Sequence, residues 1–304
     1  AISQVVVGNS MVVPNPLNGD LTTHSIERTI QPELNRFLLS HVIGKDPVLP
    51  IISALSWMAD TCEQLYPGFR FKSSEDTSVL KGIVLKDDTP ISCNIQVKEL
   101  EKSDSGDLKL DVLVSSELEE GKSLNHYRST IVLSSTNQSL PDFCEVNLKE
   151  TETQSGEEFY SNGTLFHGPL FQSVKKQLNI NEKCLTLLCT SPLVDSEESA
   201  QFQPIPFNAF ADDTQLQALL IWVRHFYETA SLPLKIGKGE FFRHIPFNTP
   251  YFITLEVVSS TDTKLTANTF VHDEDGKLYS QLIGAEAVIS KALDSKFVGN
   301  NPAD

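Results

Sequence analysis

The stretch His41-Val42-Ile43-Gly44-Lys45-Asp46-Pro47-Val48-Leu49-Pro50 leads directly into an apolar segment with helical spacing. The apolar side chains of that segment recur every three or four residues, at Ile51, Leu55, Met58, Cys62 and Leu65. This period predicts an amphipathic helix. Pro50 stands just ahead of the helix, where proline is tolerated best, and Pro67-Gly68 predicts its end. The sequence therefore predicts a buried helix that begins close to a histidine.

The second half of the chain repeats this plan. Asp213-Thr214-Gln215-Leu216-Gln217 opens another apolar helical segment, expected from about residue 212. Alternating apolar and polar side chains predict strands at 108–114, within 170–191, and at 251–258, 265–272 and 277–289. Each half is thus predicted to be a long helix wrapped by an antiparallel sheet. Two such units side by side give an α+β fold that could share one sheet and hide its edges.

A polar segment between about residues 137 and 160 separates these two halves. The 304 residues suffice for two domains of about 150 residues each. We therefore predict an N-terminal subdomain, 1–150, that carries the histidine motif. A C-terminal subdomain, 151–304, would carry the aspartate motif.

Composition narrows the class of protein. Hydrophobic residues make up 40% and charged residues 21%, as in ordinary globular proteins. No apolar run approaches the roughly 18 residues of a membrane span, and no signal peptide is visible. Five cysteines without CxxC spacing indicate a reducing compartment, so we predict a cytoplasmic location. The missing initiator Met favours a piece excised from a larger polypeptide. The net charge of −16 argues against non-specific nucleic-acid binding.

His41 is a candidate general base. Gly44 and Pro47 allow a tight turn between His41 and the start of the predicted helix. Backbone N–H groups at that helix start could polarise a thioester carbonyl while His41 removes the neighbouring α-proton. The plainer alternative is a hydrogen-bonded loop histidine without a chemical role.

Asp213 is the candidate general acid on the other half. An acid must carry a proton, and burial near Phe207 and Phe210 would have to favour the protonated form. Gln217 lies four residues later on the same helix face and could orient the carboxyl group. Two alternatives stay open: Asp213 could simply cap the helix, and its neighbour Asp212 could serve as the acid instead.

A third cluster, Phe166-His167-Gly168-Pro169-Leu170-Phe171-Gln172, follows the polar segment. Its plainer interpretation is a Gly-Pro turn whose aromatic neighbours belong to the core. His167 could instead be a polar point inside an acyl tunnel. No HExxH, P-loop, Rossmann or GxSxG pattern is present, so the sequence predicts no metal site and no nucleotide cofactor.

In combination, the three clusters resemble the dehydratase domains of polyketide synthases and polyunsaturated fatty acid synthases. These domains are double hot-dog folds with HxxxGxxxxP, YGPxF and DxxxQ/H motifs in that order. The corresponding segments here are His41–Pro50, His167–Phe171 and Asp213–Gln217. Two positions depart from the pattern: Lys45 occupies the usual glycine position, one residue after Gly44, and His167 replaces the usual tyrosine.

The resemblance implies elimination of water from a 3-hydroxyacyl thioester to give a trans-2-enoyl thioester. His41 would abstract the α-proton, and Asp213, held by Gln217, would protonate the departing hydroxyl group. Backbone N–H groups near Pro50 and Ile51 would bind the thioester oxygen. No cofactor would be needed. The remaining substrate-binding positions implied by the motifs are Gly44, His167, Gly168 and Phe171.

The resemblance also implies a partner, a phosphopantetheine-bearing acyl carrier protein on the same polypeptide, together with other domains of a multidomain synthase. Carrier proteins are acidic and would be repelled by a chain of charge −16. A basic patch formed by Lys175-Lys176 and the segment from Lys235 to Arg243, or the high effective concentration of a tethered carrier, could offset this repulsion.

Two other functions remain open. A hot-dog thioesterase would hydrolyse the thioester, with a carboxylate that activates water. A non-catalytic acyl-binding domain would instead serve as a scaffold within a synthase, since one fold hosts many functions.

Overall fold

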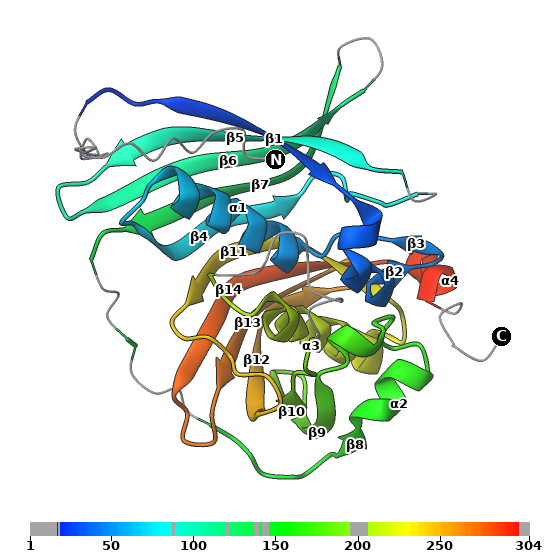
Figure 1. The fold of residues 1–304 in the computed structure, drawn as a ribbon. Coiled ribbons are helices and arrows are strands. Elements are labelled where there is room, and N and C mark those ends of the chain that lie inside the picture. The colour runs from blue at the N-terminus through cyan, green and yellow to red at the C-terminus, as the bar shows by residue number, and fades with distance from the viewer. Residues whose placement is uncertain are drawn as a thin grey trace.

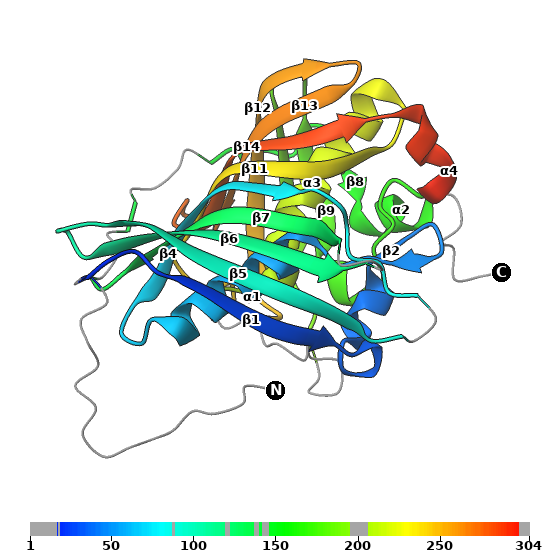
Figure 2. The same ribbon diagram turned by 90° about the horizontal axis from the view of Figure 1, so that it is seen from above.

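The computed structural model describes residues 17, 19–86, 89–118, 122–136, 140–141, 146–194 and 206–297. Their dominant feature is an antiparallel sheet of twelve strands that curls around two long helices, as Figures 1 and 2 show. The strand order is β1-β5-β6-β7-β4-β11-β14-β13-β12-β10-β9-β8. The predicted α+β architecture with one shared sheet is confirmed.

The first part of the chain supplies one end of this sheet. Its strands are β1 (Thr23–Ile30), β4 (Arg70–Val79), β5 (Ile91–Lys102), β6 (Asp107–Glu117) and β7 (Ser123–Ser134). The helix α1 (Ile51–Leu65) packs against β4 and β7. Ahead of it lie the 3-10 helices η1 (Pro32–Leu34) and η2 (Arg36–Ser40) and a small hairpin of β2 (Val42–Ile43) and β3 (Asp46–Pro47).

The second part supplies the other end. Its strands are β8 (Gln154–Ser155), β9 (Val174–Ile180), β10 (Cys184–Thr190), β11 (Ser231–Phe241), β12 (Pro250–Thr261), β13 (Lys264–His272) and β14 (Leu278–Ile289). The helix α3 (Ala209–Tyr227) packs against β10 to β14. The short helices are α2 (Gly156–Ser161), η4 (Pro169–Phe171), η5 (Lys291–Leu293) and α4 (Asp294–Phe297).

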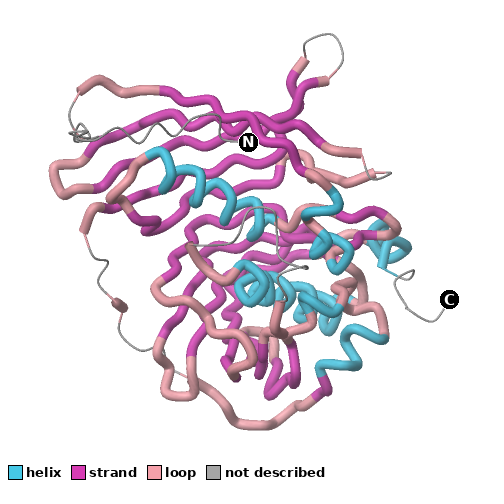
Figure 3. Tube along the Cα trace, in the orientation of Figure 1, coloured by secondary structure: helices cyan, strands magenta, loops and turns pink. Residues whose placement is uncertain are grey.

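Both long helices lie inside the curve of the sheet and contact each other (Figure 3). Every residue from Ile51 to Cys62 is buried, and so is every residue from Ala209 to Val223. The predicted helix over 51–65 is confirmed. The second helix begins earlier than predicted, because the Asn208 side chain accepts a hydrogen bond from the Ala211 N–H (3.2 Å) and caps it.

The strand that joins the two ends, β11, was not predicted as a strand. It pairs with β4 on one side and with β14 on the other. The strands predicted from alternation are present, because that pattern matches one buried and one exposed face. The predicted linker over 137–160 is partly wrong, since β8 and α2 occupy its final residues. Residues 137–139 and 142–145 lie outside the described part.

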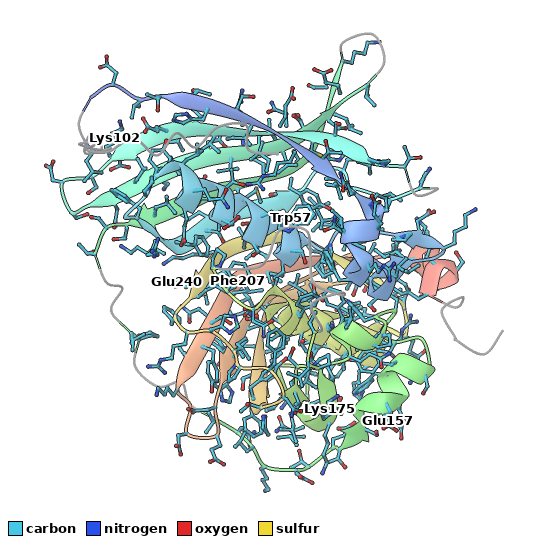
Figure 4. All side chains as sticks on the ribbon, viewed as in Figure 1. Trp57, Lys102, Glu157, Lys175, Phe207 and Glu240 are labelled. Atoms are coloured by element: carbon cyan, nitrogen blue, oxygen red, sulfur yellow. The ribbon has the colours of Figure 1, made fainter. Side chains whose placement is uncertain are left out.

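The predicted basic patch is wrong. Ion pairs join Lys235 to Asp76 (3.0 Å), Lys238 to Glu240 (2.8 Å) and Lys176 to Glu150 (2.6 Å). The two segments also lie apart: Figure 4 labels Lys175 near α2 and Glu240 at the opposite side of the view. Ion pairs with nearby carboxylates therefore neutralise charges that the sequence shows as a basic run.

The cysteines of the described residues form no disulfide: Cys62, Cys93, Cys184 and Cys189 are free, and Cys144 lies outside the described part. Among the described helices, none combines the length and the apolar character that a membrane crossing requires.

Candidate active site

A backbone contact brings the histidine motif of the first part against the Gly-Pro motif of the second. Gly168 N–H donates to Ser40 O (2.8 Å), and His41 and His167 form an isolated antiparallel bridge. A Cβ atom at position 168 would lie 2.9 Å from Ser40 Cα, closer than real Cβ contacts come. Glycine at this position therefore permits the approach that places the two histidines side by side.

The His41 ring is buried and oriented by a backbone carbonyl. Its Nδ1 lies 2.7 Å from Val48 O, and a carbonyl oxygen can only accept a hydrogen bond. Nδ1 therefore carries the proton of the neutral ring, and Nε2 keeps its lone pair. Burial lowers the pKa of His41 from 6.5 to about 4 and outweighs the opposing charge of Asp213. At neutral pH the ring is uncharged and can accept a proton at Nε2.

Asp213 lies in the second turn of α3, facing the two histidines. His167 Nε2 and Gln217 Nε2 each lie 3.4 Å from Asp213 Oδ2. Gln217 is itself fixed, because its Nε2 donates to Phe171 O (2.9 Å) and its Oε1 accepts from Tyr160 Oη (3.0 Å). The residue that caps α3 is Asn208, so the alternative that Asp213 serves as the helix cap is wrong. Sequence reasoning missed Tyr160, which lies 57 residues before Gln217 with no spacing signal to link them.

The ionisation of Asp213 differs from expectation. Burial raises its pKa, but the hydrogen bond and charge of His167, the charge of His41 and the hydrogen bond from Gln217 together lower the pKa below its ordinary value. The expectation that burial would prevail is therefore wrong. The two histidines reach this carboxyl group from outside α3, which the helix position of Asp213 and its aromatic neighbours could not reveal.

Asp212 points away from this cluster. Its Oδ1 accepts hydrogen bonds from Ser280 Oγ and from Gln215 Nε2 (3.1 Å), and Gln215 Oε1 accepts in turn from Thr269 Oγ1 (2.9 Å). Burial raises the pKa of Asp212 from 3.8 to about 7, although these hydrogen bonds lower it. Adjacent positions on a helix face different directions, so only Asp213 of this pair reaches the histidines.

The raised pKa of Asp212 predicts a pH-dependent stability. The folded state holds this proton more tightly than the unfolded chain, so the stabilisation is complete below about pH 4 and is lost as the pH rises through 7. The slope reaches at most about 1.4 kcal/mol per pH unit. The variant Asp212→Asn cannot titrate there. The free energy of unfolding of both proteins is measured in urea from pH 5 to 8. As the pH increases, the value for the variant should rise relative to that of the unsubstituted chain. Parallel curves would contradict the assignment.

A cavity of about 200 Å³ opens over the two histidines and Asp213. Its polar side chains are those of His41, His167, Asp213, Gln217 and Tyr127. The other lining residues are apolar or glycine: Ile43, Val48, Leu49, Pro50, Ile51, Val79, Gly82, Phe166, Leu216, Leu220, Leu232, Pro233 and Leu234. A small polar cluster in an apolar cavity suits a ligand with one reactive polar end and a hydrocarbon part.

The predicted site residues divide into two groups. His41, Pro50, Ile51, His167, Asp213 and Gln217 line the cavity. Gly44, Gly168 and Phe171 do not, although Phe171 borders it through its ring, 5.7 Å from that of His41. Gly44 N–H donates to Lys296 O (2.8 Å), and Gly168 N–H is taken by Ser40. These two glycines therefore shape the backbone beside the cavity.

Comparison with known proteins bears on this geometry. A trans-AT polyketide synthase dehydratase domain from Brevibacillus brevis superposes with a TM-score of 0.69 at 16% identity, over 91% of this chain and 99% of the other. The dehydratase domain of the CurF module of curacin polyketide synthase gives 0.69 at 18% identity, over 91% and 99%. A dehydratase domain of a mycocerosic acid synthase-like polyketide synthase gives 0.67 at 14%, over 92% and 97%. This chain has the dehydratase-domain fold.

A curated relative agrees with this fold. It is a polyunsaturated fatty acid synthase subunit of Thraustochytrium sp., 28% identical over 258 residues, which are 83% of this chain. The chain spans only 9% of that relative's length. No protein-family model matches the chain. The resemblance inferred from the three motifs is confirmed by these similarities.

Within this dehydratase-domain fold, Tyr127 of β7 is a cavity residue that sequence reasoning missed. Its hydroxyl group donates to Leu49 O (2.7 Å) and accepts from Ile83 N–H (3.2 Å). It thereby fixes the chain just before α1. Nothing in the alternation of β7 distinguishes this tyrosine from other core residues, so only the tertiary contact could reveal it.

The same fold brings together three groups that could ligate a metal ion. One ligand atom each of His41, His167 and Asp213 lies within 4.8 Å of the others, and all three residues are buried. Two imidazoles and a carboxylate suit Zn²⁺ or a similar divalent ion. The expectation that no cofactor is needed therefore stays a prediction, and the functional assay below includes a chelator.

Proposed function

We propose that this chain is a dehydratase that removes water from 3-hydroxyacyl thioesters and releases trans-2-enoyl thioesters. One observation carries the proposal. An uncharged histidine with a free Nε2 and a buried carboxyl group, from different parts of the chain, converge within 4.8 Å in an apolar cavity. Elimination of water needs a base at the α-carbon and an acid at the oxygen of the adjacent β-carbon. Two groups at this separation can serve both.

In the proposed first step, His41 Nε2 takes the α-proton. The bond between Nδ1 and Val48 O stabilises the imidazolium that forms, because Nδ1 keeps its hydrogen throughout. Negative charge then moves from the α-carbon to the thioester oxygen. A group that donates hydrogen bonds to this oxygen lowers the barrier.

The start of α1 supplies such donors. No side chain caps this helix, its first turn holds no acidic residue, and Ile51 and Ile52 are buried. Since the first N–H groups of a helix have no partner within it, the N–H of Ile51 beside the cavity, which has no acceptor among the described residues, can donate to the thioester oxygen. Pro50 has no N–H and contributes shape alone.

The second half of the reaction is the departure of the β-hydroxyl group, which takes a proton from Asp213 and leaves as water. The lowered pKa of Asp213 favours its ionised form in the substrate-free protein, so the carboxyl group must gain this proton when the substrate binds. A hydrophobic acyl chain that displaces water from the cavity favours the uncharged pair, neutral His41 with protonated Asp213. Gln217 and His167 both contact the Asp213 carboxyl group and hold it in position for the substrate.

The same proposal covers the setting of the reaction. The acyl group would arrive on the phosphopantetheine of an acyl carrier protein, as part of a multidomain polyunsaturated fatty acid or polyketide synthase in the cytoplasm. The relative in Thraustochytrium is one subunit of a polyunsaturated fatty acid synthase. We further propose that residues 1–150 and 151–304 are two hot-dog subdomains, since β4 and β11 join two sets of strands, each around its own helix.

Product analysis tests the proposal. The chain is incubated with a 3-hydroxybutyryl pantetheine thioester, or with its trans-2-enoyl counterpart, and the products are resolved by mass spectrometry. We expect loss of one water in the first case and gain of one in the second, unchanged by a metal chelator.

Other outcomes favour the other candidates. Free acid and thiol would identify a thioesterase. Binding of both thioesters without conversion would support the acyl-binding scaffold. Conversion abolished by the chelator and restored by Zn²⁺ would overturn the cofactor-free mechanism.

A further inference from the structure

Five exposed cations on one side of the molecule have no ionic partner within the described residues. They are Arg36, Lys45, Lys81, Lys86 and Lys296. Within the described residues, none of the five has a carboxylate oxygen at salt-bridge distance. Many other lysines and arginines of this acidic chain are paired with carboxylates. Other exposed lysines are unpaired as well, so these five are distinguished by their position beside the cavity opening and the groove described below.

Burial of the lining residues locates the opening. His41 and Asp213 are only 8% and 3% exposed, whereas Leu234 at the start of β11 is 37% exposed. Ile43 of β2 and Gly82 after β4 are half-buried cavity residues. The cavity therefore opens between β2, the segment that follows β4, and the beginning of β11.

Three of the cations border this opening, and we name them the rim lysines: Lys45, Lys81 and Lys296. Lys45 follows Ile43 by two residues, and Lys81 is next to Gly82. Lys296 belongs to α4, which lies beside β2 in Figures 1 and 2, and its carbonyl accepts the Gly44 N–H (2.8 Å). Lys45, which stands where the dehydratase motif has glycine, thus places a charge at the rim.

A surface groove of about 770 Å³ continues from the rim at Lys45. Arg36 and Lys86 line it, and Leu39, 68% exposed, adds an apolar contact. The acidic residues in its lining are Glu33 and Asp46. In the groove lining the three cations Arg36, Lys45 and Lys86 outnumber these two carboxylates, so the lining carries net positive charge on a chain of net charge −16.

We propose that the rim lysines, with Arg36 and Lys86, form the docking surface for an acidic acyl carrier domain. The carrier's acidic face would lie along the groove, and its phosphopantetheine phosphate would meet the rim lysines while the arm enters the cavity. The proposal rests on the proposed function and replaces the basic patch that the sequence suggested. It also resolves the repulsion between two acidic proteins, because complementary patches steer association even where net charges oppose it.

The test compares one acyl group on two carriers. The variant Lys45→Glu/Lys81→Glu/Lys296→Glu is assayed with 3-hydroxybutyryl groups on a phosphopantetheinylated carrier domain and on free pantetheine. We expect kcat/KM for the carrier-bound substrate to fall at least tenfold, since steering contributes about 10- to 1000-fold to association. Turnover of the pantetheine thioester should stay within twofold, because the rim lysines do not contact the reacting atoms.

A matched control separates docking from net charge. Lys98, Lys149 and Lys277 are also exposed and unpaired within the described residues, and their replacement by glutamate changes the charge equally. We expect this second triple variant to keep its activity on the carrier-bound substrate. Equal losses in the two triple variants, no loss in the rim variant, or an equal loss of the rim variant on both thioesters would overturn the proposal.

Direct binding keeps this test independent of catalysis. The affinity of the phosphopantetheinylated carrier for His41→Ala, with and without the rim substitutions, is measured by fluorescence anisotropy at low and high salt. We expect at least tenfold weaker binding in the rim variant and a smaller difference at high salt. Absence of pantetheine-thioester turnover in the unsubstituted chain would instead count against the proposed function. Equal carrier affinity with and without the rim substitutions would count against the docking surface.

Discussion

The variant His41→Ala is expected to lose about 10²- to 10⁴-fold in kcat/KM for dehydration, the usual contribution of a positioned general base. The expectation follows from geometry. The Val48 carbonyl fixes the proton on Nδ1, and burial, which lowers the pKa to about 4, keeps Nε2 free at neutral pH. The other imidazole in the cavity lining, His167, directs its Nε2 at Asp213 (3.4 Å).

Measurement of both reaction directions sharpens this prediction. Hydration of the enoyl thioester should fall by the same factor, because one transition state serves both directions. Near-ultraviolet circular dichroism and the melting temperature report whether the fold persists. A folded His41→Ala protein with near-native rates would show that the base lies elsewhere.

The variant Asp213→Asn is expected to lose a similar factor, about 10²- to 10⁴-fold, whereas Asp212→Asn should keep most of the activity. An asparagine at position 213 has nearly the same shape as the aspartate but cannot deliver a proton. Asp212 reaches Ser280 and Gln215 and does not line the cavity. The pair therefore compares two adjacent, buried carboxyl groups that differ mainly in direction.

The kinetics of these two variants distinguish catalysis from structure. Asp213→Asn should bind the enoyl thioester with an affinity close to that of the unsubstituted chain, so its loss should appear in kcat. Near-native turnover in Asp213→Asn together with an inactive Asp212→Asn would reverse the assignment of the acid.

Local periodicity in the amino-acid sequence was enough to predict part of the fold. The helix over 51–65 and the strand around 108–114 follow from apolar spacing, because one face of each must be buried. The motifs also named His41 and Asp213 as reacting groups before their contact was known. Their side chains do converge, although they are far apart along the chain. The chemical type of a residue and the local turn beside it can be predicted from the sequence without knowledge of the fold.

Features that depend on contacts between distant segments could be seen only in the folded chain. β11 joins the halves through pairing with β4, and its Lys235 meets the carboxylate of Asp76, which the sequence places far away. The ionisation of Asp213 depends on His167 and Gln217, and Gln217 depends on Tyr160. Hydrogen bonds and charges act over a few ångströms in space, whatever the separation along the chain. For this reason the sequence indicated which residues could react, and only the fold set their protonation.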